Sequence, residues 1–215
     1  PFHEESPRPP GPNIYYDQED YLRDVVEKMG ITWTVVRPSF LIGDNPRAQY
    51  SLFMGLAVYA SLLKAQSMPL IFPADAAAAS CLYELTDSDL AAALLEWGAL
   101  TPAAHNQAFN VVNGQPVRWR DLWEPFAGLF GMTGEIRPEG FNSRAFFDAN
   151  KAHWDQLVRE HGLQPFSLSD LTPSDIFETA FVQDWDTVLS MDKARRLGFT
   201  RTVDPLEMFA RHIQR

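Results

Sequence analysis

Cysteine is almost absent from this sequence, because Cys81 is the only one among 215 residues. No disulfide can form within the chain, which favours a reducing compartment, and we expect a cytoplasmic protein. Long apolar runs are also missing. The longest extends from Leu52 to Leu63 and is shorter than the roughly 20 residues that span a bilayer. No stretch has the pattern of a signal peptide, so we predict no membrane partner.

Positive charge is scarce as well. The chain has 18 Lys and Arg residues against 28 Asp and Glu, which gives a formal net charge of −10. An acidic protein is repelled by phosphate backbones, so we predict no nucleic-acid partner. The five histidines share no ligand spacing with carboxylates, and we therefore predict no metal site. A Gly-x-Ser-x-Gly motif is absent, which argues against serine hydrolase chemistry.

A helix followed by a strand is the clearest pattern that the sequence does contain. Apolar residues recur at helical spacing, at Leu22, Val25, Val26 and Met29. Asn13 is suited to cap this helix and Gly30 to end it, and Glu19 can pair with Arg23 one turn later. Residues 32–36 are β-branched or aromatic and predict a strand. A helix that leads into a strand is half of a βαβ unit, so we predict an α/β fold with a parallel sheet.

Two tyrosines begin this helix, near the strand ends where open α/β sheets bind ligands. The sequence Asn-x-Tyr-Tyr-x-x-Glu-Asp, with Gly-Ile-Thr-Trp-x-Val-x-Arg-Pro at residues 30–38, resembles the progesterone 5β-reductase/iridoid synthase-like (PRISE) branch of the extended short-chain dehydrogenases. Ala-Phe-Asn-Val-x-Asn-Gly at residues 108–114 resembles the same branch. Ordinary members of the superfamily carry Tyr-x-x-x-Lys. Here Glu19 stands four residues after Tyr15, and that departure is typical of the branch.

The resemblance implies a domain organisation. It implies part of a Rossmann-type parallel sheet joined to a mixed, largely helical substrate lobe. Residues 1–50 would form the last portion of the nucleotide-binding domain, with the catalytic tyrosine helix. Residues 51–215 would form mainly the substrate lobe, with some strands returning to the Rossmann sheet. The glycine-rich phosphate loop and the catalytic lysine would precede Pro1, so the first expected partner is the missing N-terminal half of the same chain.

The resemblance also assigns site residues by position. Tyr15 is expected to be catalytic and to contact the cofactor. The other expected cofactor contacts are Pro38, Leu41, Ala48 and Gln49, and the expected substrate contacts are Phe40, Tyr50 and Phe177. The implied cofactor is NADP as NADPH, with NAD as the alternative. The implied substrate is a small enone or carbonyl compound.

The implied activity is reduction of the C=C bond of an α,β-unsaturated carbonyl compound by hydride transfer. Hydride addition to the β-carbon leaves negative charge on the carbonyl oxygen, and the phenol of Tyr15 can stabilise that enolate. One alternative is an NAD(P)-dependent epimerase, dehydratase or ketone reductase of the same fold, although the missing Tyr-x-x-x-Lys disfavours it. The other is a non-catalytic substrate or oligomerisation lobe, because the cofactor-binding half would be absent.

Four local patterns complete the prediction. Residues 51–65 are apolar nearly all round, which predicts a helix that is buried or lies in an interface. A homodimer is therefore one of the expected partners. Asp87 and Asp89 are better suited to cap a helix that ends near Leu100 than to bind a metal. Residues 128–134 have the glycine spacing of a phosphate loop, but a helix precedes them and a strand follows, so we predict a helix end and turn. Residues 75–80 are expected to form a loop.

Overall fold

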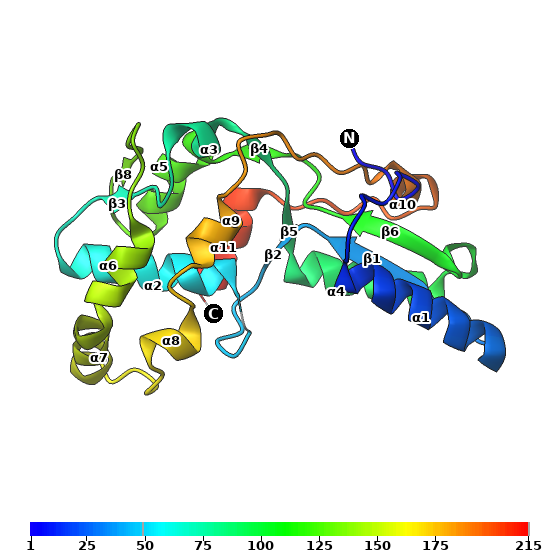
Figure 1. Ribbon diagram of the computed structural model, residues 1–215, viewed down its shortest axis with the longest axis horizontal. Coiled ribbons are helices and arrows are strands. Elements are labelled where there is room, and N and C mark those ends of the chain that lie inside the picture. Colours follow the sequence, from blue (N-terminus) through cyan, green and yellow to red (C-terminus); the bar gives the residue numbers. More distant parts are fainter. Residues whose placement is uncertain (49, 215) are drawn as a thin grey trace.

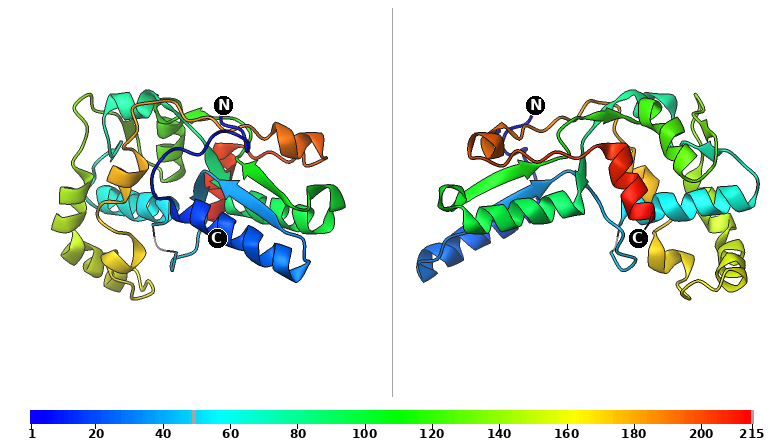
Figure 2. Two further views of the ribbon diagram at one scale, coloured as in Figure 1. Left: turned by 45° about the vertical axis from the view of Figure 1, so that its right-hand side comes forward. Right: turned by 180° about the vertical axis from the view of Figure 1, so that it is seen from behind.

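The computed structural model describes residues 1–48 and 50–214. Its elements form two groups that lie side by side in Figure 1. One group contains the paired strands β1 (Thr34–Pro38) and β6 (Gln107–Val111) with helices α1 (Ile14–Met29), α4 (Ser88–Leu100) and α10 (Asp192–Arg196). The other is mostly helical, and the last helix, α11 (Pro205–Ile213), lies between the two groups (Figure 2).

Parallel pairing connects segments that are far apart in the sequence. Strand β1 pairs in parallel with β6, with Thr34 opposite Gln107 and Pro38 opposite Val111. Strand β2 (Phe40–Ile42) pairs in parallel with β5 (Leu85–Asp87). A smaller core fills the space between β6, α4 and α10 and includes Leu94, Phe109, Val111, Ala194 and Phe199. The expected α/β fold with a parallel sheet is confirmed.

The helical group is built around α2 (Leu52–Ala65) and α5 (Trp119–Leu129). Nine residues of α2 are buried within the chain, so this chain itself buries the helix whose sequence is apolar all round. The shorter helices are α3 (Ala76–Ser80), α6 (Ser143–Ala149), α7 (Lys151–Glu160), α8 (Leu168–Leu171) and α9 (Ile176–Ala180), with a 3₁₀ turn at Pro102–Ala104. Two short pairs complete the group, the parallel β3 (Leu70–Ile71) with β8 (Gly134–Glu135) and the antiparallel β4 (Leu82–Tyr83) with β7 (Val117–Arg118).

Aromatic rings dominate the core of the helical group. The rings of Trp119 and Trp123 are 5.9 Å apart, and that of Phe72 is 5.0 Å from Trp123 in an edge-on arrangement. Both tryptophans are almost fully buried, at 0% and 1% exposure. Each buried aromatic ring removes a large apolar surface from water, so these residues have a structural role.

Local sequence signals predicted the ends of several elements. The side chain of Asn13 caps α1, and Gly30 ends it with φ 65° in the left-handed region that favours glycine. Gly131, with φ 63°, turns the chain after α5 and confirms the helix end expected for residues 128–134. The loop expected for residues 75–80 is wrong. Asp75 caps a short helix there, because four consecutive alanines have the highest helix propensity.

Candidate active site at the end of strand β1

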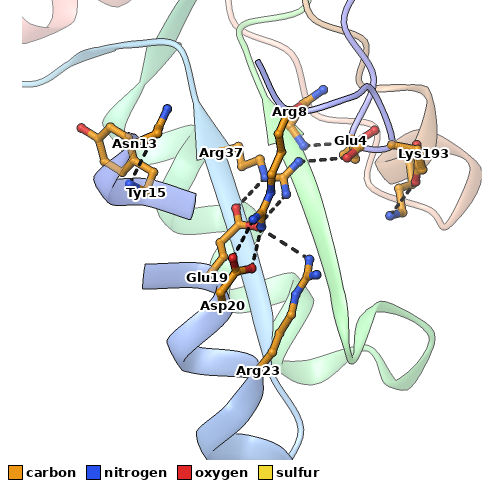
Figure 3. Close-up of polar contacts among 11 residues, drawn as sticks. Glu4, Arg8, Asn13, Tyr15, Glu19, Asp20, Arg23, Arg37 and Lys193 are labelled. Carbon is orange, nitrogen blue, oxygen red and sulfur yellow. Dashed lines mark hydrogen bonds and ion pairs between the residues drawn. The ribbon is translucent and has the colours of Figure 1, made fainter. Parts of the chain in front are cut away.

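The first turn of α1 lies at the carboxyl end of β1, because the helix leads through a short turn into a strand that runs back beside it (Figure 1). The Asn13 Oδ1 atom accepts a hydrogen bond of 3.0 Å from the backbone N–H of Tyr15. The Tyr15 residue is 72% exposed. In Figure 3 its ring points away from the ion pairs at the next turn. Tyr15 therefore presents its phenol at the surface of this chain.

The neighbouring Tyr16 has a different environment. The guanidinium carbon of Arg8 lies 4.5 Å from the centre of its ring, a cation–π contact. Arg8 also donates two hydrogen bonds to the carboxylate of Asp20, at 2.8 and 2.9 Å. Of the two tyrosines, only Tyr15 is therefore exposed and directed away from this ion pair.

Glu19 stands at the position where ordinary short-chain dehydrogenases carry lysine, and it is buried, with 6% exposure. Its two carboxylate oxygens accept hydrogen bonds from Nε and Nη2 of Arg37, both at 2.7 Å. The guanidiniums of Arg8 and Arg23 lie 3.5 and 3.7 Å from Oε2 (Figure 3). The hydrogen bonds from Arg37 lower the pKa of the Glu19 carboxyl below its ordinary value. The predicted pair of Glu19 with Arg23 is confirmed as the longest of these contacts.

The N-terminal segment extends this network to β6. Arg37 donates through Nη1 to the backbone carbonyl of Glu4 at 3.0 Å. The Glu4 side chain in turn accepts from the backbone N–H of Asn110 at 2.8 Å. The Asn110 amide donates to the carbonyls of Phe2 and Ser190, each at 3.1 Å. Hydrogen bonds therefore join α1, β1, the N-terminal segment and β6 into one structure.

The remaining predicted cofactor residues lie in β1, in β2 and in the loop after β2. Pro38 is exposed at the end of β1, and Leu41 is 49% exposed within β2. Ala48 and Tyr50 line one pocket of about 330 Å³ together with residues 169–173. Tyr50 has φ 56°, a conformation that aromatic residues rarely adopt and that is often found at functional sites. The predicted contact Gln49 lies outside the described residues.

The structure places the other two predicted substrate residues apart from this pocket. Phe40 is partly buried, with its ring 6.0 Å from that of Tyr83. Phe177 is only 1% exposed and packs against Tyr59 and Phe147, at ring distances of 5.2 and 5.6 Å. Phe177 also lines a separate pocket of about 510 Å³, whose rim carries the acidic residues Asp75, Glu139, Glu178 and Asp184.

Sequence reasoning missed a buried polar cluster between the two groups of elements. Asp87, predicted as a helix cap, does cap α4 by accepting from the N–H of Asp89 at 3.0 Å. Its carboxylate also contacts Arg211 and lies 3.2 Å from Nε2 of His212. The other nitrogen of His212 lies 3.5 Å from Asp44, in the loop after β2. Adjacent charged residues at the end of α11 were the only sequence signal for these contacts.

Two kinds of feature are missing from the part of the chain that the structure describes. No group of three or more His, Cys, Asp or Glu side chains within residues 1–48 and 50–214 is arranged to hold a metal ion. Within the same residues, no helix is both long enough and apolar enough to cross a membrane.

Solved structures with the same fold define the class. The chain is similar to a UDP-glucose 4-epimerase from Thermus thermophilus in complex with NAD, with a TM-score of 0.52 and 18% identity over 98% of this chain and 58% of that one. It is also similar to the human epimerase family protein SDR39U1 with NADPH, with a TM-score of 0.53 and 13% identity over 99% and 58%. At these identities the similarity shows the fold alone. The chain thus has the Rossmann-type fold of these structures.

Sequence comparison gives the family. Residues 1–203 match the model of the PRISE-like Rossmann-fold domain, and the chain belongs to this family. It is 32% identical to an (S)-8-oxocitronellyl enol synthase of Antirrhinum majus, over 100% of this chain and 56% of that protein. It is 31% identical to a 3-oxo-Delta(4,5)-steroid 5-beta-reductase of Arabidopsis thaliana, over 93% and 52%. The chain spans about half the length of these relatives.

Proposed function

We propose that this chain supplies the catalytic tyrosine and the substrate-facing part of an NAD(P)H-dependent reductase. Its reaction would be reduction of the C=C bond of an α,β-unsaturated carbonyl compound. The observation that carries the proposal is the position of Tyr15, exposed at the carboxyl end of β1 in a chain of the PRISE-like family. Named relatives include a steroid 5-beta-reductase and several enol synthases, which supports reductive chemistry.

Exposed apolar residues in β1 and β2 support a nicotinamide site. Pro38 at the end of β1 and Leu41 in β2 are both exposed, and open α/β sheets hold dinucleotides at the carboxyl ends of their strands. We propose that these two residues, with Ala48 and Tyr15, hold the nicotinamide end of NADPH, with NAD as the alternative. Hydride is what the bound cofactor supplies. The phenol of Tyr15 would donate a hydrogen bond to the substrate's carbonyl oxygen, where negative charge develops in the transition state.

The exposure of β1 and its pairing with a single strand support the presence of a further nucleotide-binding part in the intact protein. Parallel sheets are normally covered on both faces, yet four of the five residues of β1 are only half-buried and the fifth is exposed. Among the described residues, β1 pairs with β6 alone. An unpaired strand edge is a template for another strand. We propose that the part with the phosphate loop and the catalytic lysine pairs at this edge.

An epimerase, dehydratase or ketone reductase is the second candidate. Such an enzyme passes a proton through the phenol, and a nearby cation makes that phenol more acidic. Four residues after Tyr15, however, this chain carries a carboxylate held by Arg37. This position departs from the Tyr-x-x-x-Lys of ordinary short-chain dehydrogenases, and the departure favours the enone reductase. A non-catalytic lobe is the third candidate, because the chain spans about half the length of its relatives.

The test uses an intact protein in which these residues are joined to the nucleotide-binding half. We expect Tyr15→Phe to lower kcat for NADPH-dependent reduction of a small enone by about 100-fold or more, the magnitude seen when a donor to a developing oxyanion is lost. Tyr16→Phe is the matched control and should change kcat less than threefold, because Tyr16 packs under Arg8. Unchanged turnover in Tyr15→Phe would refute the assigned role.

Product analysis separates the candidates. A saturated ketone from an enone indicates C=C reduction, whereas an allylic alcohol indicates a ketone reductase.

Titration of the 215-residue chain with NADPH tests the placement of the phosphate loop. Binding by this chain alone, at an affinity close to that of the intact protein, would contradict it. Absence of any NADPH oxidation by the intact protein across enones and ketones would favour the non-catalytic lobe.

A further inference from the structure

Helix α1 has little buried surface to hold it in place. Of its residues, only Glu19 and Val26 are buried. Its apolar residues with the largest exposures are Ile14, Tyr15, Tyr21 and Met29, at 63% or more. Most surface helices are held by a continuous apolar stripe on one face. In α1 the buried carboxylate of Glu19 therefore helps to hold the helix against the rest of the chain, a role that apolar contacts fill in most surface helices.

The carboxylate of Glu19 is held in a defined geometry. Both of its oxygens accept hydrogen bonds of 2.7 Å from Arg37. Paired hydrogen bonds between a carboxylate and a guanidinium fix orientation as well as distance, and they are among the strongest in proteins. This pair ties one turn of α1 to β1 immediately before Pro38 (Figure 3).

Both ends of this ion pair are connected to the proposed active site. Glu19 stands one helical turn after Tyr15, so a shift of Glu19 moves the turn that carries the phenol. Arg37 directly precedes Pro38, a proposed cofactor contact. Arg37 is itself held by the carbonyl of Glu4 at 3.0 Å. The Glu19–Arg37 pair therefore sets the distance between the helix that carries Tyr15 and the strand end that would face the nicotinamide.

We infer that Glu19 is a positioning residue for Tyr15, acting through its ion pair with Arg37. It stands where ordinary short-chain dehydrogenases place a catalytic lysine, but a carboxylate enclosed by guanidiniums cannot supply a cation to the phenol. It fixes the position of the helix instead. The inference rests on the proposed function, because it requires Tyr15 to be catalytic. Its consequence is large, since a displacement of about 1 Å can slow a reaction 100-fold.

The chain contains a matched control on the same turn. Glu19→Gln and Asp20→Asn each remove one negative charge and keep the shape of the side chain. Asp20 is exposed and pairs with Arg8, whereas Glu19 is buried and pairs with Arg37. A general effect of charge near the start of the helix would appear in both variants. An effect of the ion pair with β1 would appear only in Glu19→Gln.

The experiment measures amide hydrogen exchange and steady-state kinetics on the same intact protein. In Glu19→Gln we expect exchange at residues 16–20 to accelerate at least tenfold, and kcat for enone reduction to fall at least tenfold with less than a threefold change in KM. Loss of kcat without loss of binding is the signature of a misplaced transition-state contact. Arg37→Lys, which keeps the charge but loses the paired geometry, should lie between the wild type and Glu19→Gln. Asp20→Asn should change exchange and kcat less than twofold.

The outcomes distinguish this inference from the proposed function. Wild-type exchange in Glu19→Gln, or equal effects of Glu19→Gln and Asp20→Asn, would overturn the positioning role. Fast exchange with unchanged turnover in Glu19→Gln, while Tyr15→Phe still abolishes turnover, would also overturn it. If exchange accelerates but neither Glu19→Gln nor Tyr15→Phe affects turnover, the proposed function fails and the structural ion pair stands.

Discussion

The imidazole of His212 lies 3.2 Å from the carboxylate of Asp87, and both side chains are at most 1% exposed. They come from distant parts of the sequence, because His212 belongs to α11 and Asp87 is the last residue of β5 and the N-cap of α4. Asp87 also accepts from Asp89 N–H and contacts Arg211, and its own N–H donates to Asn113 at 2.7 Å. One buried carboxylate therefore caps a helix and fixes α11 against it.

Removal of this carboxylate should destabilise the protein strongly. We expect Asp87→Ala to lower the free energy of unfolding by about 2–4 kcal/mol, because it removes a helix cap and leaves the buried imidazole of His212 and the half-buried guanidinium of Arg211 without their acceptor. Asp204→Ala is the control, since Asp204 caps α11 but is exposed, and it should cost about 1 kcal/mol. Urea unfolding of both variants measures the difference. A similar loss in the two would mean that Asp87 acts as a helix cap only.

Glu19 predicts a dependence of stability on acid pH. Hydrogen bonds from Arg37 lower its pKa in the folded state, so its contribution to stability is present above the ordinary pKa of 4.5 and is lost as the pH falls through the lowered value. The difference in unfolding free energy between wild type and Glu19→Gln should thus be largest near pH 7. It should shrink steadily below about pH 4.5, the ordinary glutamate value.

The control for this titration lies on the same helix. Glu27 is exposed, so Glu27→Gln should change the free energy of unfolding by less than about 0.5 kcal/mol at any pH in the series. Unfolding curves from pH 7 down to about pH 3, well below the ordinary glutamate pKa, give both comparisons. A difference between wild type and Glu19→Gln that stays constant below about pH 4.5 would show that the carboxylate's ionisation does not stabilise the fold.

The sequence predicted the elements whose signals are local. Asn13, Gly30 and the apolar spacing between them predicted α1, and the β-branched residues after Gly30 predicted β1 with a start two residues early. Contacts between distant segments were not predictable in this way. Asp87 gave no sign of His212, which is 125 residues away in the sequence. The pairing of Glu19 with Arg37 depends on how the helix lies on the strand, and spacing predicted only the weaker pair with Arg23.

Gly98 in α4 and Gly128 in α5 differ in the space around them, so alanine should have opposite effects at the two positions. A Cβ atom at Gly98 would lie 2.7 Å from Cγ2 of Thr34, so Gly98→Ala should destabilise by about 1–3 kcal/mol through overpacking. Gly128 is an exposed helical residue, and a Cβ atom added there would meet no atom within 4 Å. Gly128→Ala should stabilise by about 0.5–1 kcal/mol, because alanine loses less backbone entropy in a helix. Thermal unfolding tests both signs, and destabilisation by Gly128→Ala would contradict the argument.

The resemblance placed Phe177 and Tyr50 in one substrate pocket, and their burial predicts that they behave differently. Phe177 is 1% exposed among aromatic rings, so Phe177→Ala should cost about 3–5 kcal/mol of stability through the cavity it leaves. Tyr50 is 60% exposed, and Tyr50→Ala should change stability by less than about 0.5 kcal/mol. If Tyr50 contacts the substrate, its replacement should raise KM for the enone in the intact protein while the unfolding curve stays unchanged. A raised KM in a Phe177→Leu variant of wild-type stability would show instead that Phe177 faces the substrate, and that the adjoining acidic-rimmed pocket belongs to the site.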